Sequence, residues 1–427
     1  MADRAATCAG CGCGCDDIEV AVGAEALERV TGTCPLGDAW FAERTADPPP
    51  AARVDGREVD VAEAVDVAAA ILSEARFPLV CGLTATDCEG QRAAVALAEA
   101  IGAVIDPVGP TDAGAAAAAA QAFGLSTATF GDVRDRAEVA VAWRADPATT
   151  HPRLLPRLRL DRAGRAAGAH PARTLVVIDA ERTETAEEAD VFIALPPERD
   201  FEALWALRAL VRDIPIDRDP TAGLPLDAFG ELAGRLRACS YGAMLYGSGL
   251  AATADGYVNV LGLLALVRDL AATAHVVALP LRGDGNARGA EDVLAWQTGY
   301  PSAVTFAPGH PVASPGELSA AAVLARGEAD AALVVGSDPL EHLPAAAADA
   351  LRAIPVVTVD GRATTTAETA RVAFTTAAAG VHRAGVAHRL DGVPVPLHPV
   401  AGSDRPGDDE VLAALAGRLH RNGEATA

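Results

Sequence analysis

The sequence contains no lysine, because all 35 of its basic residues are arginine. No lysine amine is therefore available to form a Schiff base or to act as a general base. A chain that is rich in alanine and free of lysine is typical of a GC-rich genome and favours a bacterial source. Adaptation to salt is the alternative explanation of the same composition.

Aromatic residues are scarce, at 4% of the chain, and the formal net charge is −23. A single-stranded nucleic acid is bound by stacking on aromatic rings, and any phosphate backbone by positive charge. The composition therefore excludes nucleic acid as a partner. The hydrophobic content of 50% excludes a disordered chain.

Long apolar runs are also missing. The longest, such as residues 260–267, stay far below the roughly 18 residues of a membrane span. The N-terminus lacks the basic and apolar regions of a signal peptide. We therefore expect a cytoplasmic protein with reduced thiols. Its 427 residues are enough for two or three domains of about 150 residues each.

Five of the eight cysteines lie in the first 34 residues. Cys8, Cys11, Cys15 and Cys34 have a spacing that can wrap four thiolates round one metal group, and glycines between them allow the backbone to curl. Sets of four thiolates suit an iron–sulfur cluster or zinc. We predict an iron–sulfur cluster, with structural zinc or an empty loop as alternatives. Cys13 is the additional cysteine, and we expect it to be packed without a ligand role.

Of the remaining cysteines, Cys81 is expected in a buried strand and Cys239 at a buried helix end. Cys88 follows a polar loop and stands where a helix over residues 90–101 is predicted. A helix N-terminus favours a thiolate, so Cys88 is a candidate nucleophile or metal ligand. An idle loop thiol is the alternative.

After a proline-rich linker at residues 47–51, short apolar runs alternate with helical patterns. This alternation predicts a doubly wound α/β fold with largely parallel sheets, whose ligands bind at the carboxyl ends of strands. The predicted strands cover residues 79–81, 104–106, 139–143, 175–179, 191–194, 244–246, 276–279, 332–335, 356–360 and 372–375.

Part of the sequence occurs twice with identical spacing. Residues 177–191 match residues 358–372, and each copy is preceded by an Asp-Pro pair, at Asp146 and Asp338. An acid after a strand can accept the N–H groups of a guanine or the hydroxyls of a ribose, and a nearby threonine can hold phosphate. The repeat predicts a duplicated nucleotide-binding half, although helix capping is the simpler alternative.

A second polar loop covers residues 281–292 and contains Arg282, Gly283, Asn286 and Gly289. Glycines and arginines after a strand are typical of anion-binding loops. A solvated surface turn is the alternative. The histidines His310, His342, His382, His388 and His398 show no ligand spacing, and we expect them to be surface or core residues.

These motifs together resemble the molybdopterin oxidoreductases along nearly the whole chain, and within them the B subunit of formylmethanofuran dehydrogenase. The resemblance is carried by the cysteines with the sequence CDDI at residues 15–18, by TDCE at 86–89, by residues 176–200, by LAWQTG at 294–299 and by RLDGVP at 389–394.

The resemblance implies a redox enzyme of one-carbon metabolism. Tungsten or molybdenum would be held by molybdopterin guanine dinucleotides and Cys88, and a [4Fe-4S] cluster by Cys8, Cys11, Cys15 and Cys34. Carbon dioxide and formate would be interconverted, with Arg199 and Arg282 as candidates to hold the carboxylate. The implied cofactor-binding residues are Asp179, Thr183, Asp200, Gly283, Asn286, Gly289 and Asp338. The implied partners are the sister subunits of the same complex, namely its A, C and D subunits.

The expected organisation is a Cys-rich iron–sulfur-type head at 1–52, one Rossmann-like half formed by 53–82 with 236–400, a second half at 83–235 and a C-terminal helix or tail at 401–427. The bacterial formyltransferase/hydrolase complex has a related B subunit, and a non-redox structural role there is the alternative function. Leu36, which stands where related chains have a basic residue, and Glu198, which replaces a glycine, favour that alternative.

Overall fold

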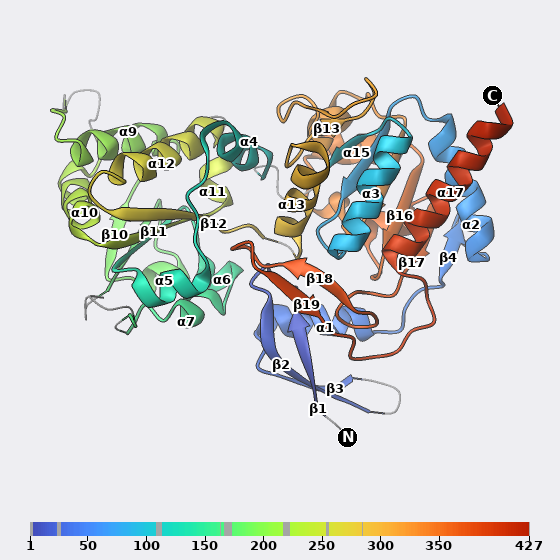
Figure 1. Ribbon diagram of the computed structural model, residues 1–427, viewed down its shortest axis with the longest axis horizontal. Helices are drawn as coiled ribbons and strands as arrows, with labels where there is room; N and C mark the ends of the chain where they lie inside the picture. Colours follow the sequence, from blue (N-terminus) through green and yellow to red (C-terminus); the bar gives the residue numbers. More distant parts are fainter. Residues whose placement is uncertain are drawn as a thin grey trace. The chain divides into compact units, whose positions relative to one another are not determined.

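We describe the chain from a computed structural model, which covers residues 3–23, 27–107, 113–162, 164–165, 173–216, 223–252, 256–283 and 285–426. The chain divides into two compact units (Figure 1). Unit 1 comprises Met1–Gly114 and Gly283–Ala427, and unit 2 comprises Ala115–Arg282. In the described residues no helix has both the length and the apolar character needed to cross a membrane.

A nine-stranded sheet forms the centre of unit 1, in the order β14-β13-β7-β6-β15-β16-β17-β4-β5. Its five middle strands are parallel, as predicted for a doubly wound fold, and antiparallel pairs extend both edges. The strands are β4 (Ala52–Val54), β5 (Arg57–Glu58), β6 (Pro78–Gly82), β7 (Val104–Asp106), β13 (Val304–Thr305), β14 (Val312–Ala313), β15 (Ala331–Val335), β16 (Val356–Asp360) and β17 (Val372–Thr375).

Helices cover both faces of this sheet, because alternate residues of a strand point to opposite faces. Val80 and its neighbours pack against one helical layer, and Leu79 and Cys81 pack against another. The first layer contains α2 (Val61–Glu74), α3 (Cys88–Ala100), α13 (Ala287–Thr298) and α17 (Asp408–Thr426). The second contains α14 (Ala320–Ala325) and α15 (Ala345–Ala353), and short helices η1 (Pro339–Glu341) and α16 (Thr365–Thr369) follow two strand ends.

The cysteine-rich head belongs to unit 1 and is a small antiparallel sheet with one helix. It consists of β1 (Asp3–Cys8), β2 (Cys15–Val22), β3 (Leu27–Thr31) and α1 (Pro35–Thr45). A separate hairpin of β18 (Gly385–His388) and β19 (Pro394–Leu397) contacts β1. The Thr7 hydroxyl donates to the Pro396 carbonyl at 2.7 Å, so the head rests on a segment 389 residues away in sequence.

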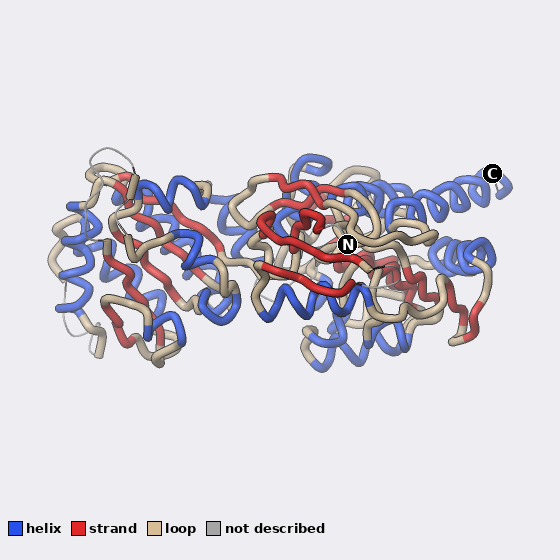
Figure 2. Tube along the Cα trace, turned by 90° about the horizontal axis from the view of Figure 1, so that it is seen from below, coloured by secondary structure: helices blue, strands red, loops and turns tan. Residues whose placement is uncertain are grey.

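Unit 2 is built on a five-stranded parallel sheet in the order β10-β9-β8-β11-β12, with helices on either side of the strands (Figure 2). Its strands are β8 (Val139–Trp143), β9 (Thr174–Asp179), β10 (Val191–Ala194), β11 (Tyr241–Tyr246) and β12 (His275–Pro280). Its helices are α4 (Ala113–Phe123), α5 (Phe130–Arg136), α6 (Pro147–Thr150), α7 (Leu154–Leu158), α8 (Glu184–Glu187), α9 (Asp200–Val211), α10 (Leu226–Ala238), α11 (Ser248–Ala251) and α12 (Gly256–Leu270).

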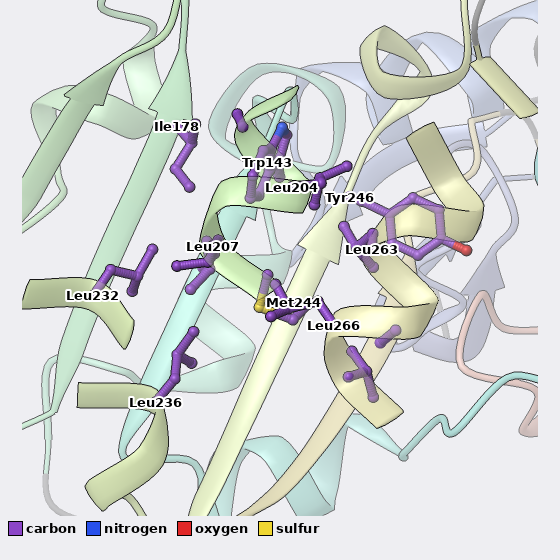
Figure 3. Packing of buried hydrophobic residues seen from close by; sticks show 14 of the residues in the cluster. Trp143, Ile178, Leu204, Leu207, Leu232, Leu236, Met244, Tyr246, Leu263 and Leu266 are labelled. Atoms are coloured by element: carbon purple, nitrogen blue, oxygen red, sulfur yellow. The ribbon is translucent and has the colours of Figure 1, made fainter. Parts of the chain in front are cut away.

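The core of unit 2 lies between this sheet and helices α9, α10 and α12 (Figure 3). Trp143 and Met244 from the strands meet Leu207 and Leu263 from the helices, and all four side chains are fully buried. Burying a leucine-sized side chain stabilises the fold by about 1.5–3 kcal/mol. This packing fixes the carboxyl end of β8, which Arg144 and Asp146 follow.

Each predicted strand forms, but the strands divide between the sheets differently from the expected halves. We expected 53–82 to join 236–400, and β6 and β4 do pair with β15 and β17. However, β7, expected in the other half, pairs with β6 in unit 1, and β11 and β12, expected in the first half, join β8 in unit 2. The divisions fall at 114 and 282 rather than at 82 and 235. Sheet membership depends on pairing between distant strands, which a local apolar pattern does not specify.

Candidate functional site

The four cysteines predicted to hold a cluster are gathered in the head. Cys8 ends β1 and Cys15 begins β2, and their Cα atoms are partners in the strand register. Cys11 lies in the connecting loop, where Gly12 and Gly14 have φ angles of +75° and +51°. Those left-handed conformations favour glycine and allow the loop to turn sharply. Cys34 precedes α1, at a helix N-terminus that stabilises negative charge.

The thiols are close enough to influence one another's charge. The pKa of Cys8 is raised to about 12, chiefly by burial and in smaller part by the charges of Cys15, Cys11 and Cys34. Four thiolates at this spacing therefore require a positive group between them. Among the described residues, no three or more His, Cys, Asp or Glu side chains are arranged for a single metal ion.

The loop between Cys8 and Cys15 is held by two segments that belong to sequence motifs. The N–H of Gly285 donates to the carbonyl of Gly10 at 3.2 Å, and the N–H of Leu390 donates to that of Gly12 at 2.8 Å. A Cβ atom on Gly10 would lie 3.5 Å from the Cys8 sulfur, so the backbone passes close to this thiol. The polar loop near 285 therefore supports the head.

Cys88 is the first residue of α3, two residues earlier than the predicted helix start. Asp87 caps the helix by accepting the N–H of Gly90 at 3.0 Å. The Cys88 side chain is buried, and Asn286 Nδ2 lies 3.8 Å from its sulfur. Burial raises the pKa of the Cys88 thiol to about 11, against the hydrogen bond from Asn286, which lowers it. The expectation that the helix terminus favours a thiolate is thus not met by the protein alone, because desolvation and nearby acids outweigh it.

Asn286 is fixed in a single orientation. Its Oδ1 accepts the N–H of His388 at 2.7 Å, so its Nδ2 must donate, both to the carbonyl of Thr86 at 3.0 Å and toward Cys88. Gln91 Nε2 donates to the backbone carbonyl of Asn286 at 3.1 Å. A Cβ atom on Gly289 would overlap Asn286 Oδ1. Asn286 and Gly289, both predicted to bind a cofactor, are therefore packed round the Cys88 loop.

His388 lies in this neighbourhood, and the sequence did not indicate that it would contact Asn286. Its Nδ1 lies 2.7 Å from Asp292 Oδ2, and Arg288 Nε donates to the same oxygen at 3.0 Å. We expected a surface or core histidine, and it is indeed buried. Its position directly before the motif RLDGVP was the one available signal.

The strand-end acids of the repeat accept hydrogen bonds from threonines of the same chain. Asp146 Oδ1 accepts the N–H and the hydroxyl of Thr185 at 2.8 and 2.6 Å, and Asp338 Oδ1 accepts those of Thr366 at 3.0 and 2.5 Å. Asp338 Oδ2 also accepts the N–H of Thr365 at 2.6 Å. The duplication is therefore visible as two matching contacts, and both oxygens of Asp338 are occupied by its own chain.

The other predicted guanine-binding residues lie in unit 2. Thr183 caps α8 by accepting the N–H of Ala186 at 3.2 Å. Asp179 and Asp200 both accept hydrogen bonds from Arg144, and Trp143 Nε1 also donates to Asp200 at 2.8 Å. Asp200 is almost fully buried, whereas a fifth of the Asp179 side chain is exposed.

The two candidate substrate arginines are also in unit 2, and the structure brings neither together with Cys88 in one unit. Arg199 precedes α9, and its Nε lies 3.3 Å from Glu202. The carbonyl of Arg282 accepts a hydrogen bond from Nε2 of buried His151 at 2.9 Å. Gly283 begins the second segment of unit 1.

No family model matches the chain. The B subunit of the tungsten-containing formylmethanofuran dehydrogenase 2 of Methanocaldococcus jannaschii is 35% identical over 406 residues, which is 93% of each chain. The chain belongs to the family of formylmethanofuran dehydrogenase B subunits. The B subunit of the formyltransferase/hydrolase complex Fhc of Methylorubrum extorquens is 31% identical over 261 residues, 60% of this chain and 66% of that protein.

One solved structure agrees with this family assignment, and a second shares the fold. A chain of the formyltransferase/hydrolase complex FhcABCD of Methylorubrum extorquens, solved with methylofuran, matches with a TM-score of 0.73 and 28% identity, over 88% of this chain and 100% of that one. Acetylene hydratase from Pelobacter acetylenicus matches with a TM-score of 0.70 over 98% of this chain and 69% of that one. At 13% identity, the latter match shows the α/β fold alone.

Proposed function

We propose that this chain is the redox-active B subunit of a formylmethanofuran dehydrogenase-type complex in one-carbon metabolism. The reaction is the reversible two-electron interconversion of carbon dioxide with formate, the oxidation level of the formyl group in formylmethanofuran, at a tungsten- or molybdenum-pterin site. The observation that carries this proposal is the gathering of the four head thiols within electrostatic range of one another in the same unit as Cys88.

The head supports an electron-transfer role. Cys8, Cys11, Cys15 and Cys34 are the four soft ligands that a [4Fe-4S] cluster takes. The close packing of Gly10 and Gly37 on the Cys8 sulfur excludes larger side chains there. None of the eight cysteines, all of which are described, forms a disulfide.

Cys88 supports the role of metal ligand. When bound, a tungsten- or molybdenum-pterin group supplies two-electron chemistry at a single metal, and Cys88 would provide a thiolate ligand to it. A neutral thiol is favoured without metal, so metal binding displaces a proton from Cys88. Asn286 orients the sulfur with its amide N–H, and Gln91 holds Asn286 in place.

The other predicted site residues have proposed roles as well. Arg199 and Arg282 are the candidates to hold a carboxylate, which a guanidinium binds with two parallel hydrogen bonds. The proposed pterin-contacting residues are Asp179, Thr183, Asp200, Gly283, Asn286, Gly289 and Asp338. The duplicated Rossmann-like halves and the iron–sulfur-type head are the fold features that would present them.

We further propose that the chain works in the cytoplasm with its sister subunits, the A, C and D subunits of the same complex. Both curated relatives are named as B subunits, and the matching solved structure is a four-component complex. Exposed aromatic side chains such as Trp205 and Trp296, at 49% and 66% exposure, provide surface for such contacts.

The second candidate function is a non-redox structural subunit of a formyltransferase/hydrolase complex that releases formate from formyl-tetrahydromethanopterin. Two observations favour it. Leu36, two residues after the fourth head cysteine, is apolar and 42% exposed. The chain also covers the whole of the matched chain of the hydrolase complex.

Elemental analysis of the complex purified anaerobically from its host separates the two. We expect about four irons on the head cluster and one tungsten or molybdenum per copy of this chain. Cys88→Ala should lose the heavy metal and keep the iron, and Cys34→Ala should lose iron. Cys239→Ala, a buried thiol at the end of α10, is the matched control and should lose neither. A complex without iron, tungsten or molybdenum that still hydrolyses formyl groups would contradict the redox proposal.

A further inference from the structure

The strand end of β8 carries an arginine in an unusual backbone conformation. Arg144 follows β8 with a φ of +47°, in the left-handed region that favours glycine. Its equivalent in the repeat, two residues before the second Asp-Pro pair, is Gly336 with a φ of +52°. The same backbone turn thus occurs in both units, with a side chain in unit 2 only.

The Arg144 guanidinium bridges two acids. Nε and Nη2 donate to the two carboxylate oxygens of Asp200 at 2.9 and 3.1 Å, and Nη1 donates to Asp179 at 3.3 Å. Nη2 also donates to the carbonyl of Pro196 at 2.9 Å. The Arg144 side chain is only 8% exposed. Four of its five N–H groups thus have partners, so the side chain is held firmly between the strand ends.

Room for this side chain comes from glycines on the next strand end. A Cβ atom on Gly249 would lie 3.1 Å from the Cβ of Arg144, and one on Gly247 would overlap the Arg144 carbonyl. In unit 1 there is no room for a side chain at Gly336, because a Cβ atom there would lie 2.7 Å from the backbone N of Thr86. The strand-end acid Asp360 is instead paired with Arg362, two residues further along, at 3.1 and 3.0 Å.

The guanidinium group of Arg144 presents the same hydrogen-bond donors as a guanine base. A guanine base offers a carboxylate two parallel N–H donors from its N1 and N2 atoms, and an arginine offers the same pair of donors. Asp179 and Asp200 are two of the acids in the segment 176–200, which resembles a guanine-binding signature. The Arg144 guanidinium takes both oxygens of Asp200 and one oxygen of Asp179, so it lies in the place between the two acids where the donors of the base would lie.

We propose that Arg144 occupies the guanine subsite of unit 2 with its own guanidinium, so that this unit does not bind the guanine of a pterin dinucleotide through Asp179 and Asp200. The chain then holds at most one guanine dinucleotide. This inference rests on the proposed function for the identity of the ligand, and it modifies the roles proposed there for these two acids.

The test compares binding of guanosine monophosphate to the intact complex before and after Arg144→Gly, which restores the residue found at position 336. We expect saturable binding to the variant that is at least about tenfold tighter than to the unchanged complex, the size of effect given by a pair of charge-assisted hydrogen bonds. Adenosine monophosphate, which lacks the paired donors, should show no gain. Arg182→Gly, an exposed arginine beyond the end of β9, is the matched control for lost charge.

A second measurement uses the unchanged complex and so does not depend on the variant folding. Acid hydrolysis followed by chromatography counts the guanine nucleotides released per copy of this chain, and we expect no more than one. Two per chain, or an Arg144→Gly complex that folds and gains no affinity for guanosine monophosphate, would overturn the inference. Absence of iron and heavy metal would instead contradict the proposed function and leave the nucleotide comparison readable.

Discussion

The two copies of the repeat are alike in their helix caps and unlike at the residue that follows the preceding strand. In both, an acid after the first strand accepts the N–H and hydroxyl of a threonine from the helix after the second. Beside this shared contact, unit 1 has Gly336 and unit 2 has Arg144. Contacts that hold the backbone are thus common to both units, whereas the side chain that faces the strand ends differs.

The charge environment differs between the units as well. Burial raises the pKa of Asp106 and of Asp408, both in unit 1, to about 7. In unit 2 the described carboxyl groups with resolved shifts, Asp135 and Asp146, have lowered pKa values because hydrogen bonds stabilise their charge. Unit 1 also contains Asp292 and Asp330, whose pKa values are lowered, but among the described residues only unit 1 has carboxyl groups with raised pKa values. The two units should therefore respond differently to pH between about 4 and 7.

The largest effect we expect is the response of unit 1 to pH. Folded Asp106 stays protonated to about pH 7, while the unfolded group ionises above its ordinary value of 3.8. The unfolded chain thus loses this proton first, so the free energy of unfolding falls as pH rises from about 4 to about 7, by roughly 1.4 kcal/mol per pH unit for each such acid. It is constant above that range.

Hydrogen exchange of amides in β6 and β7, compared with β8 and β9, measures this response. The unit 1 amides should lose protection as pH rises through that range, after correction for intrinsic exchange, and the unit 2 amides should not. Asp106→Asn should roughly halve the slope, in unit 1 only, since its side chain no longer ionises while Asp408 still does. Equal pH slopes in the two units would contradict the comparison.

A smaller effect is expected from removing the strand-end acids. Asp338→Ala leaves three donors without their charged acceptor, two of them buried, and should lower the free energy of unfolding by about 3 kcal/mol. Asp146→Ala affects a more exposed acid and should cost about half as much. Chemical denaturation followed by probes in each unit gives both values. A larger loss for Asp146→Ala would show that the two contacts are not equivalent.

Two arginines that follow strand ends, Arg362 in unit 1 and Arg182 in unit 2, should differ in how much their loss destabilises the fold, because they differ in exposure. Arg362→Ala leaves the buried Asp360 carboxylate without its ion pair and should cost about 2–3 kcal/mol. Arg182→Ala removes an exposed side chain that pairs with Glu187 at 3.9 Å and lies 5.0 Å from the centre of the Phe192 ring, and it should change the free energy of unfolding by less than about 0.5 kcal/mol. Thermal unfolding of both variants provides the comparison, and equal destabilisation would contradict it.

The smallest effect tests how alike the caps are. Thr183 and Thr364 each accept an N–H from the third residue of the following helix, at 3.2 and 3.0 Å. Thr183→Ala and Thr364→Ala should each cost about 1 kcal/mol. Thr→Ser at either position keeps the acceptor and should cost less. A clear difference between the two alanine variants would mean that one threonine has a role besides capping.

Local patterns in the sequence were sufficient to locate many features. Short apolar runs specified the strands, since a buried strand needs little beyond its own side chains to be identified. Cys81 and Cys239 were correctly expected to be buried, and both are. The start of α3 was misplaced by two residues, because Asp87 caps the helix through the N–H of Gly90 and so begins it earlier than the apolar pattern does.

The site was harder to predict, because its contacts join residues far apart in the chain. His388 meets Asn286 across 102 residues, and Asn286 meets Cys88 across 198. Neither pair is marked by a local spacing. The protonation preference of Cys88 was also not predictable, since it depends on burial and on neighbouring acids from other elements.

By itself, the sequence determined the elements, the repeat and the family, because these depend on residue order and on short-range periodicity. Tertiary structure alone decided which strands share a sheet, which residue holds Cys88, and that Arg144 lies between Asp179 and Asp200. The physical reason is that strand pairing, desolvation and ion pairing depend on distances in space, and those are set only when the whole chain packs.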